Sequence, residues 1–300
     1  MTTKPAVDFS ESPQAPRDAA NILADLARAD GWMLDVDGCL VRTSKAGGAG
    51  GQLIEGAAQL LDWLRRHERQ FVICTNASQR TVATYAAHLR HIGLDIADHE
   101  MMTAATAAAD TIARAHPGAR VLVVGDEGMV EAVRAAGLEL ADSDASDAQA
   151  VVVGAADHYN SSNLNAACLS IADHGAPLYT SVASPWFHGG VKRSIAVSSA
   201  IARAIASVTG ASPIVCGKPS PELGAGLRRR LGGPDSRIVI VGDAAAAEIV
   251  LARQMGALGV LVLSGATHAD ALPHLPDEQR PHWVAKDVGE LFKQLHSVVP

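Results

Sequence analysis

The chain has 300 residues, of which 48% are hydrophobic and 19% are charged, so it is long and apolar enough to form about two folded domains rather than a disordered chain. Its 25 basic and 32 acidic residues give a net charge of −7, which argues against a nucleic-acid or anionic-membrane binder, because both need a basic surface. Without an apolar stretch of membrane-spanning length or an apolar signal-peptide core near the N-terminus, a cytoplasmic protein is expected.

Short β-branched runs alternate with Ala- and Leu-rich helical segments along the whole chain. Strands are expected at 32–36, 71–74, 121–124, 150–153, 214–216, 238–241 and 258–263. Helices are expected at 57–67, 81–92, 104–115, 129–136, 163–174, 198–209 and 248–255. Apolar strands that are each followed by a helix are typical of a parallel sheet covered on both faces, so the sequence predicts a doubly wound α/β fold.

The first expected strand ends in the segment Asp35-Val36-Asp37-Gly38. Ligand sites of such sheets lie at the carboxyl ends of the strands, so this position is informative. Two carboxylates that are two residues apart on an extended segment point to the same side, and they resist joint ionisation unless a cation lies beside them. Oxygen ligands favour Mg²⁺. Taken alone, the motif fits an ordinary polar turn equally well.

Later strands also end in polar residues. Thr75 and Asn76 are able to bind phosphate oxygens, although both residue types also suit a turn or a helix N-cap. Lys218 lies in a GKPSP segment and supplies a positive charge for a phosphate or a carboxylate. Asp243 follows the strand at 238–241 and is a third candidate metal ligand. This set of residues suits a metal ion together with a phosphate group.

The order of these motifs, DxDG, TN, GKPSP and GD, resembles the signature of the haloacid dehalogenase (HAD) phosphatases. The resemblance covers about residues 30–292 and is strongest with the NagD-like branch, which includes p-nitrophenyl, phosphoglycolate, pyridoxal and nucleotide phosphatases. It implies a Rossmann-like core made of residues 1–115 and 212–300, with 1–20 as a flexible tail. An inserted α/β cap domain is expected at 116–211.

The resemblance also implies a role for each motif residue. Asp35 would be the nucleophile that accepts the phosphoryl group, and Asp37 would protonate the leaving oxygen and later activate water. Mg²⁺ would be held by the carboxylates of Asp35 and Asp243 and by the backbone carbonyl of Asp37. The residues that would bind or neutralise the phosphate are Thr75, Asn76 and Lys218.

The implied activity is that of a Mg²⁺-dependent phosphatase that hydrolyses a small phosphorylated metabolite through an aspartyl-phosphate. Sugar phosphates, phosphoglycolate-like acids, glycerol phosphate, pyridoxal phosphate and nucleotides all stay open as substrates. Dimers formed through the cap are common in the resembled family, so a homodimer is one expected option. The alternative function is that of a degenerate HAD protein, which binds a phosphorylated ligand or partner without turnover.

Two segments depart from the family pattern. The metal motif normally has a second Asp, which here is Glu248, preceded by alanines at 244–247. Glu248 either reaches the metal site or begins the next helix, where an acid suits the positive end of the helix dipole.

In the cap, Trp186, Phe187 and His188 are the candidate substrate contacts. Their alternative interpretation is a turn whose aromatic side chains pack inward, above all that of Phe187.

Other noticeable residues have less specific interpretations. The GGAGG segment at 47–51 does not fit a phosphate-binding glycine motif and is interpreted as a mobile flap or linker. Asp126 mimics the metal motif but falls in the expected cap, so it is interpreted as structural. Three of the four cysteines, Cys39, Cys74 and Cys216, lie beside the site motifs. Buried small residues are the favoured interpretation, with oxidative inactivation as the alternative.

Overall fold

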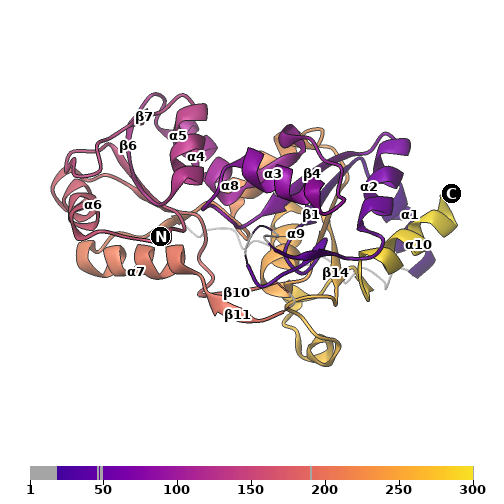
Figure 1. Ribbon diagram of the computed structural model, residues 1–300. Helices are drawn as coiled ribbons and strands as arrows, with labels where there is room; N and C mark the ends of the chain where they lie inside the picture. The colour runs from indigo at the N-terminus through magenta and orange to yellow at the C-terminus, as the bar shows by residue number, and fades with distance from the viewer. Residues whose placement is uncertain (1–18, 46, 48–49, 190, 300) are drawn as a thin grey trace, which may run out of the picture.

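The computed structural model of the protein describes residues 19–45, 47, 50–189 and 191–299. Two parallel sheets with helices on both faces lie in separate lobes of the molecule (Figure 1). The predicted doubly wound α/β fold with an inserted second α/β unit is therefore confirmed. Of the tail expected at 1–20, residues 1–18 lie outside the described part of the chain, whereas Ala19 and Ala20 begin helix α1 (Ala19–Ala27).

The larger sheet has six strands in the order β15-β14-β13-β1-β4-β5, and all its neighbouring strands are parallel. The strands are β1 (Gly31–Asp35), β4 (Gln70–Thr75), β5 (Met101–Thr103), β13 (Ile238–Gly242), β14 (Leu258–Val262) and β15 (Trp283–Ala285). β1 lies between β4 and β13, where the strand order changes direction. Ligand sites of doubly wound sheets lie at such a switch point, outside the carboxyl ends of the strands.

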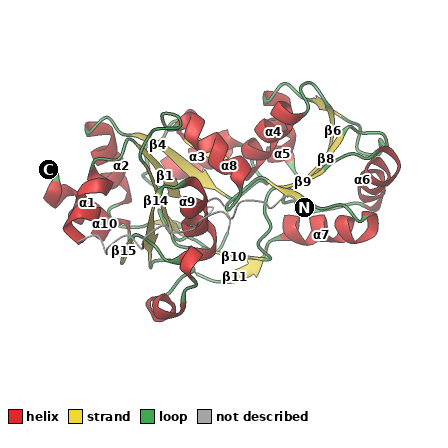
Figure 2. Ribbon diagram, turned by 180° about the vertical axis from the view of Figure 1, so that it is seen from behind, coloured by secondary structure: helices red, strands yellow, loops and turns green. Residues whose placement is uncertain are grey.

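Helices cover both faces of this sheet (Figure 2). Successive side chains of β1 point to opposite faces, so they pack against different helices. Trp32 and Leu34 face α1, α2 (Ala57–Arg66), α3 (Val82–His91) and α10 (Val288–Val298). Met33 faces α4 (Ala104–Ala115), α8 (Pro221–Arg230) and α9 (Val250–Met255). The core of the protein is thus mostly aliphatic, which agrees with its aromatic content of 4%.

The second sheet has five parallel strands in the order β12-β9-β8-β6-β7. The strands are β6 (Arg120–Val124), β7 (Glu139–Leu140), β8 (Ala150–Val153), β9 (Leu178–Thr180) and β12 (Ile214–Val215). Residues of α4 and α5 (Glu127–Ala135) pack on one face, and those of α6 (Ser161–His174) and α7 (Val197–Thr209) pack on the other. Because β12 pairs with β9, we propose that the cap ends after Val215 rather than at residue 211.

Two small antiparallel hairpins complete the fold. One joins β2 (Val41–Arg42) to β3 (Gln52–Leu53), and the other joins β10 (Trp186–His188) to β11 (Arg193–Ile195). The β10–β11 hairpin reaches from the cap lobe toward the core lobe, in the lower middle of Figure 1. Within the described residues, every helix is too short or too polar to span a bilayer.

Candidate active site

The carboxyl ends of β1 and β13 approach each other closely at the switch point. After β1, the chain turns at Gly38, which has a φ of 88°. A Cβ atom at Gly38 would overlap with Oδ2 of Asp243, which directly follows β13. Glycine is therefore needed at position 38, both for the left-handed backbone and for the approach of Asp243.

Lys218 lies at the centre of the polar cluster, and only 2% of it is exposed. Its Nζ contacts Oδ1 of Asp35, donates to the carbonyl oxygen of Cys74 at 2.9 Å and lies 2.9 Å from Oε1 of Glu248. Three acceptors from three separate segments hold the ammonium group in place. The predicted nucleophile and the predicted lysine are thus in direct contact.

The structure places Glu248 beside Lys218 in the polar cluster. Its side chain is 2% exposed, and besides the contact with Lys218 it accepts from the N–H of Ala244 at 3.0 Å. A π-helical turn, η3 (Ala245–Ile249), carries Glu248 back over Gly242. Turns of this type are rare and are frequently found at functional sites.

Asp37 is held by donors from two other segments. Thr75 Oγ1 donates to its Oδ2 at 3.2 Å, and the N–H of Gly47 donates to the same oxygen at 2.9 Å. Thr75 is itself fully buried and accepts from the N–H of Ala77 at 3.1 Å. The DxD and TN motifs are therefore joined through their side chains.

Asn76 has a function in the structure that the sequence did not indicate. Its Oδ1 accepts from the N–H of Lys218 at 2.8 Å, and its Nδ2 donates to the carbonyl oxygen of Lys218 at 3.0 Å. The two residues are 142 positions apart in the chain. Asn76, which was predicted to bind phosphate, thus holds the backbone of Lys218. The amide nitrogen of Asn76 has a second N–H, which is able to bind a phosphate oxygen.

Negative charge is in excess in the cluster, because Lys218 contacts Asp35 and Glu248, and Asp37 and Asp243 add two further carboxylates near Asp35. Burial, with the charges of Glu248 and Asp37, raises the pKa of Asp35 to about 8 despite the lysine. Burial likewise raises the pKa of Asp243 well above its usual value, and the charges of Asp35 and Glu248 add to the effect. Burial alone would lower the pKa of Lys218, but Asp35 and Glu248 raise it well above its usual value.

The donor set fits Mg²⁺, which prefers hard oxygen ligands and would compensate the excess negative charge. Asp35 and Asp243 supply buried carboxylates, 5% and 3% exposed. In the described part of the chain, no group of three or more His, Cys, Asp or Glu side chains is arranged to hold a metal ion. A magnesium ion here would therefore need a backbone carbonyl, the part that the resemblance assigns to Asp37, and water, which it commonly retains.

The candidate substrate residues lie on the β10–β11 hairpin and have different environments. Trp186 is 51% exposed, and the guanidinium carbon of Arg193 lies 4.2 Å from its ring centroid. Phe187 and His188 are half-buried, and Phe187 points to the opposite face of the hairpin because side chains alternate along a strand. The N–H of Thr43 donates to the carbonyl of Gly189 at 2.7 Å, which ties this hairpin to the segment that follows Asp37.

The three cysteines beside the motifs are all buried. Burial raises the pKa of Cys74 to about 11 and that of Cys216 to about 12, and it raises the pKa of Cys39 well above its usual value. The thiolate is the reactive form, so these environments favour inert thiols. This agrees with the interpretation of these cysteines as buried small residues.

Asp126 connects the two lobes. Its Oδ2 accepts from Nε2 of Gln79 at 2.9 Å and from the N–H of Asp157 at 3.1 Å. Gln79 belongs to the loop after β4, whereas Asp126 and Asp157 follow strands of the second sheet. These contacts agree with the structural role predicted for Asp126.

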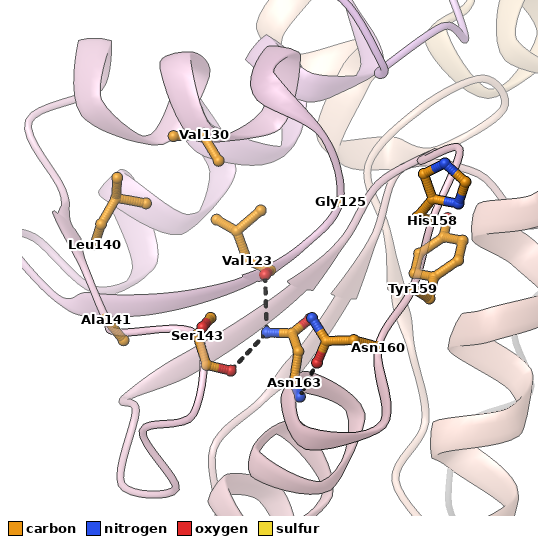
Figure 3. A pocket seen from close by; sticks show the side chains of 10 residues that line it. All are labelled: Val123, Gly125, Val130, Leu140, Ala141, Ser143, His158, Tyr159, Asn160 and Asn163. Atoms are coloured by element: carbon orange, nitrogen blue, oxygen red, sulfur yellow. Dashed lines mark hydrogen bonds between the residues drawn. The ribbon is translucent and has the colours of Figure 1, made fainter.

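A separate cavity of about 240 Å³ lies in the second lobe, beside the carboxyl ends of β6 and β7 (Figure 3). Asn163 lines it and donates through Nδ2 to the carbonyl oxygens of Val123 and Ser143, at 3.3 and 2.9 Å. None of the predicted site residues is among those that line this cavity.

Comparison with known proteins gives matches over most of the chain. Residues 32–139 match the family model of haloacid dehalogenase-like hydrolases, and residues 215–291 match a HAD-hydrolase-like model. Human chronophin is 27% identical over 286 residues, which cover 90% of this chain and 94% of that protein. The ribonucleotide monophosphatase NagD of Escherichia coli K12 is 27% identical over 257 residues, which cover 86% and 96%.

Solved structures agree with these matches. The crystal structure of glycerol phosphate phosphatase from Mycobacterium tuberculosis in complex with magnesium is 28% identical, with a TM-score of 0.77. The match covers 90% of this chain and 77% of that one. From its fold, its motifs and these relatives, the chain belongs to the haloacid dehalogenase-like hydrolases. Within them it is a phosphatase of the NagD-like group, as the motif order predicted.

Proposed function

We propose that the protein is a Mg²⁺-dependent phosphatase that hydrolyses a small phosphorylated metabolite through an aspartyl-phosphate intermediate. The observation that carries this proposal is the contact between the buried Asp35 and Lys218, with Asp37 and Asp243 at the same edge of the sheet. A protein that only binds phosphate has no need of a buried carboxylate at this position, because the carboxylate would repel the ligand.

In the first step, a carboxylate oxygen of Asp35 attacks the phosphorus atom, and the bond between phosphorus and the leaving oxygen breaks. Asp37 gives its proton to that oxygen, so the product leaves as an alcohol. Lys218 lowers the repulsion between the anionic nucleophile and the anionic phosphate. In this proposal Asn76 donates its second amide hydrogen to a phosphate oxygen and also holds Lys218 in position, whereas the Thr75 hydroxyl donates to Asp37 and so supports the proton donor.

In the second step, Asp37 takes a proton from a water molecule, which attacks the phosphorus of the aspartyl-phosphate. The bond to Asp35 breaks, phosphate is released, and the carboxylate is restored. Dividing hydrolysis into two displacements is the usual gain of covalent catalysis. Asp35, Asp243 and the carbonyl of Asp37 would hold Mg²⁺, which when bound supplies further neutralisation of the phosphoryl charge.

The relatives suggest the range of substrates to examine. One is named as a ribonucleotide monophosphatase, another as a glycerol phosphate phosphatase, and others as acid sugar phosphatases. All three names describe small phosphate monoesters or groups of them. We propose a substrate of this size, and a panel of such esters assayed with Mg²⁺ would identify it.

The catalytic proposal is tested by replacing the nucleophile. Asp35→Asn is expected to abolish the turnover of p-nitrophenyl phosphate in Mg²⁺ buffer, because an amide oxygen is a far weaker nucleophile than a carboxylate. Asp62→Asn, on the exposed surface of α2, is the matched control and should keep full activity. Comparable activity in Asp35→Asn would disprove the assignment of the nucleophile.

The degenerate binding protein is separated from the enzyme by the same panel. If no ester releases phosphate with Mg²⁺ or Mn²⁺, while inorganic phosphate still binds, the binding protein is the better description. The presence of Asp35, Asp37, Lys218 and Asp243 together favours the enzyme, because a binding function does not require the full set.

A further inference from the structure

Gly47 is the first residue of the GGAGG segment, and it lies against Asp37 rather than in solvent. Its N–H donates to Oδ2 of Asp37 at 2.9 Å in a buried contact. Its φ is 74°, a conformation that residues other than glycine rarely adopt. A Cβ atom at this position would also overlap with the ring of Tyr85. Glycine at position 47 is therefore required by the backbone and by its neighbour.

Tyr85 provides a rigid support behind Gly47. It lies in α3, is 4% exposed, and its hydroxyl accepts from the N–H of Arg80 at 3.2 Å. Gly47 is thus held between the ring of Tyr85 and the carboxylate of Asp37. The hydrogen bond to Asp37 cannot lengthen by movement of Gly47 toward α3, because the ring occupies that space.

The same oxygen of Asp37 also accepts from Thr75 Oγ1 at 3.2 Å. Two donors from different segments, the flap between β2 and β3 and the end of β4, therefore fix Oδ2. Since the carboxylate is planar, a fixed Oδ2 also sets the direction in which Oδ1 points. The orientation of a proton donor relative to the reacting oxygen strongly affects its efficiency.

We propose that Gly47 is a positioning residue, which orients the carboxylate of Asp37 for proton transfer to the leaving oxygen of the substrate. This inference rests on the proposed role of Asp37 as the general acid. It gives a function to a glycine-rich segment that the phosphate-binding motifs do not explain.

The leaving group provides a readout that a purely structural role would not change. An alkyl phosphate needs its leaving oxygen protonated, whereas p-nitrophenolate is stable as an anion and leaves with little help. The parameter kcat/KM reports the steps up to phosphoryl transfer, so it excludes the later attack of water. A misoriented Asp37 should therefore lower kcat/KM for alkyl phosphates far more than for p-nitrophenyl phosphate.

The experiment compares Gly47→Ala with Gly50→Ala. Gly50 lies in the same flap with a φ of 65°, but a Cβ atom there would meet nothing within 4 Å. Gly47→Ala is expected to lower kcat/KM for glycerol phosphate by ~10–100-fold, and for p-nitrophenyl phosphate by only ~3-fold or less. Gly50→Ala carries similar backbone strain and is expected to leave both values close to those of the wild type. Equal losses for both substrates, or no loss, in Gly47→Ala would overturn the inference.

Two further variants keep the test decisive. If Gly47→Ala does not fold, Tyr85→Leu removes the support while keeping most of the buried volume, and it should give the same difference between substrates. An equal effect of Tyr85→Leu on both substrates would then count against the inference. Asp37→Asn tests the underlying role: if it shows no dependence on the leaving group, the proposed general acid is wrong. If Asp37→Asn shows that dependence and Gly47→Ala does not, only the inference about Gly47 fails.

Discussion

Lys218 is surrounded by more negative charge than it can neutralise. Asp35 and Glu248 contact its ammonium group directly, while Asp37 and Asp243 add two further carboxylates to the cluster. A buried carboxylate that lacks a partner is costly, so the folded protein without metal holds protons that the unfolded chain would release. The stability of the protein should therefore depend jointly on pH and on Mg²⁺.

We expect the melting temperature of the metal-free protein to fall as the pH rises from about 5 to about 8. The pKa of Asp35 is raised from 3.8 to about 8 by burial and neighbouring charges. The loss of stability therefore begins above the lower value and is complete above the upper one. Mg²⁺ should restore the loss, so the gain in melting temperature on adding Mg²⁺ should be greater at the higher pH. Thermal melts in EDTA and in Mg²⁺ at both pH values measure this gain.

Asp35→Asn serves as the control for that experiment, because it removes one of the two carboxyl groups with a raised pKa and one of the charges that raise the other, and so should weaken the dependence on pH. Asp62→Asn should behave like the wild type, since its side chain is 68% exposed. A Mg²⁺ effect of equal size at both pH values would contradict the proposed role of the buried carboxylates.

Single residues were predictable from the sequence where they stand in short motifs at strand ends. Asp35, Asp37, Lys218 and Asp243 belong to this group, and the structure brings them together. The contacts of Asn76 and Gly47 were not predictable, because each depends on a partner from another segment and on a hydrogen bond that no local pattern encodes. The position of Glu248 stayed open for the same reason.

The π-helical turn η3 brings Glu248 to Lys218. In an α-helix each residue advances by about 100°, so the wider turn changes the direction in which Glu248 points. Of the alanines at 244–247, Ala245 is buried, where only a small side chain fits, and Ala246 is exposed. The sequence predicted a helix starting at residue 248, whereas α9 begins at Val250, after this turn.

Deleting Ala246 is expected to convert the turn to α-helical geometry and to move Glu248 away from Lys218. Phosphatase activity should then fall by ~10–100-fold, the usual cost of losing a residue that supports a metal site. The loss should match that of Glu248→Gln, which keeps the turn but removes the charge. Ala246→Ser changes only an exposed side chain and should keep full activity. Normal activity in the deletion variant would show that the turn has no such function.

Element prediction was accurate for the long apolar strands and missed most of the short ones, although β12 was expected at 214–216. β1, β4, β6, β8, β13 and β14 lie within two residues of the expected positions. β5, β9 and β15 have three residues each, too few for a hydrophobic pattern to emerge, and they are strands because longer neighbours pair with them. Helices α1, α8 and α10 were also missed. α8 has only four buried residues and three arginines in its last turn, so its apolar stripe is narrow.

At the scale of the whole molecule, α4 packs against both sheets, and hydrogen bonds also join the two lobes. One of these bonds joins Gln79 to Asp126, and another joins Thr43 to Gly189 on the β10–β11 hairpin. We propose that the cap closes on the substrate and that this hairpin moves with it, because closure excludes water from the reacting groups.

Trp186 provides a probe for this closure. It is 51% exposed, whereas Trp32 and Trp63 are fully buried and Trp283 is half-buried. Adding orthovanadate with Mg²⁺ is expected to lower the quenching of tryptophan fluorescence by acrylamide, because the closed hairpin shields Trp186. Trp186→Phe should remove this change and is the control. An unchanged quenching constant in the wild type would contradict closure by this hairpin.

The place of β13 in the larger sheet has a consequence for the synthesis of the chain. β13 pairs with β1, yet about 200 residues separate them, so the ribosome must complete the entire cap before β1 gains its second neighbour. At ~5–20 residues per second, one edge of this apolar strand stays unpaired for ~10–40 s. An open apolar edge is a template for aggregation during this interval. A chain truncated before β13 would keep that edge exposed permanently.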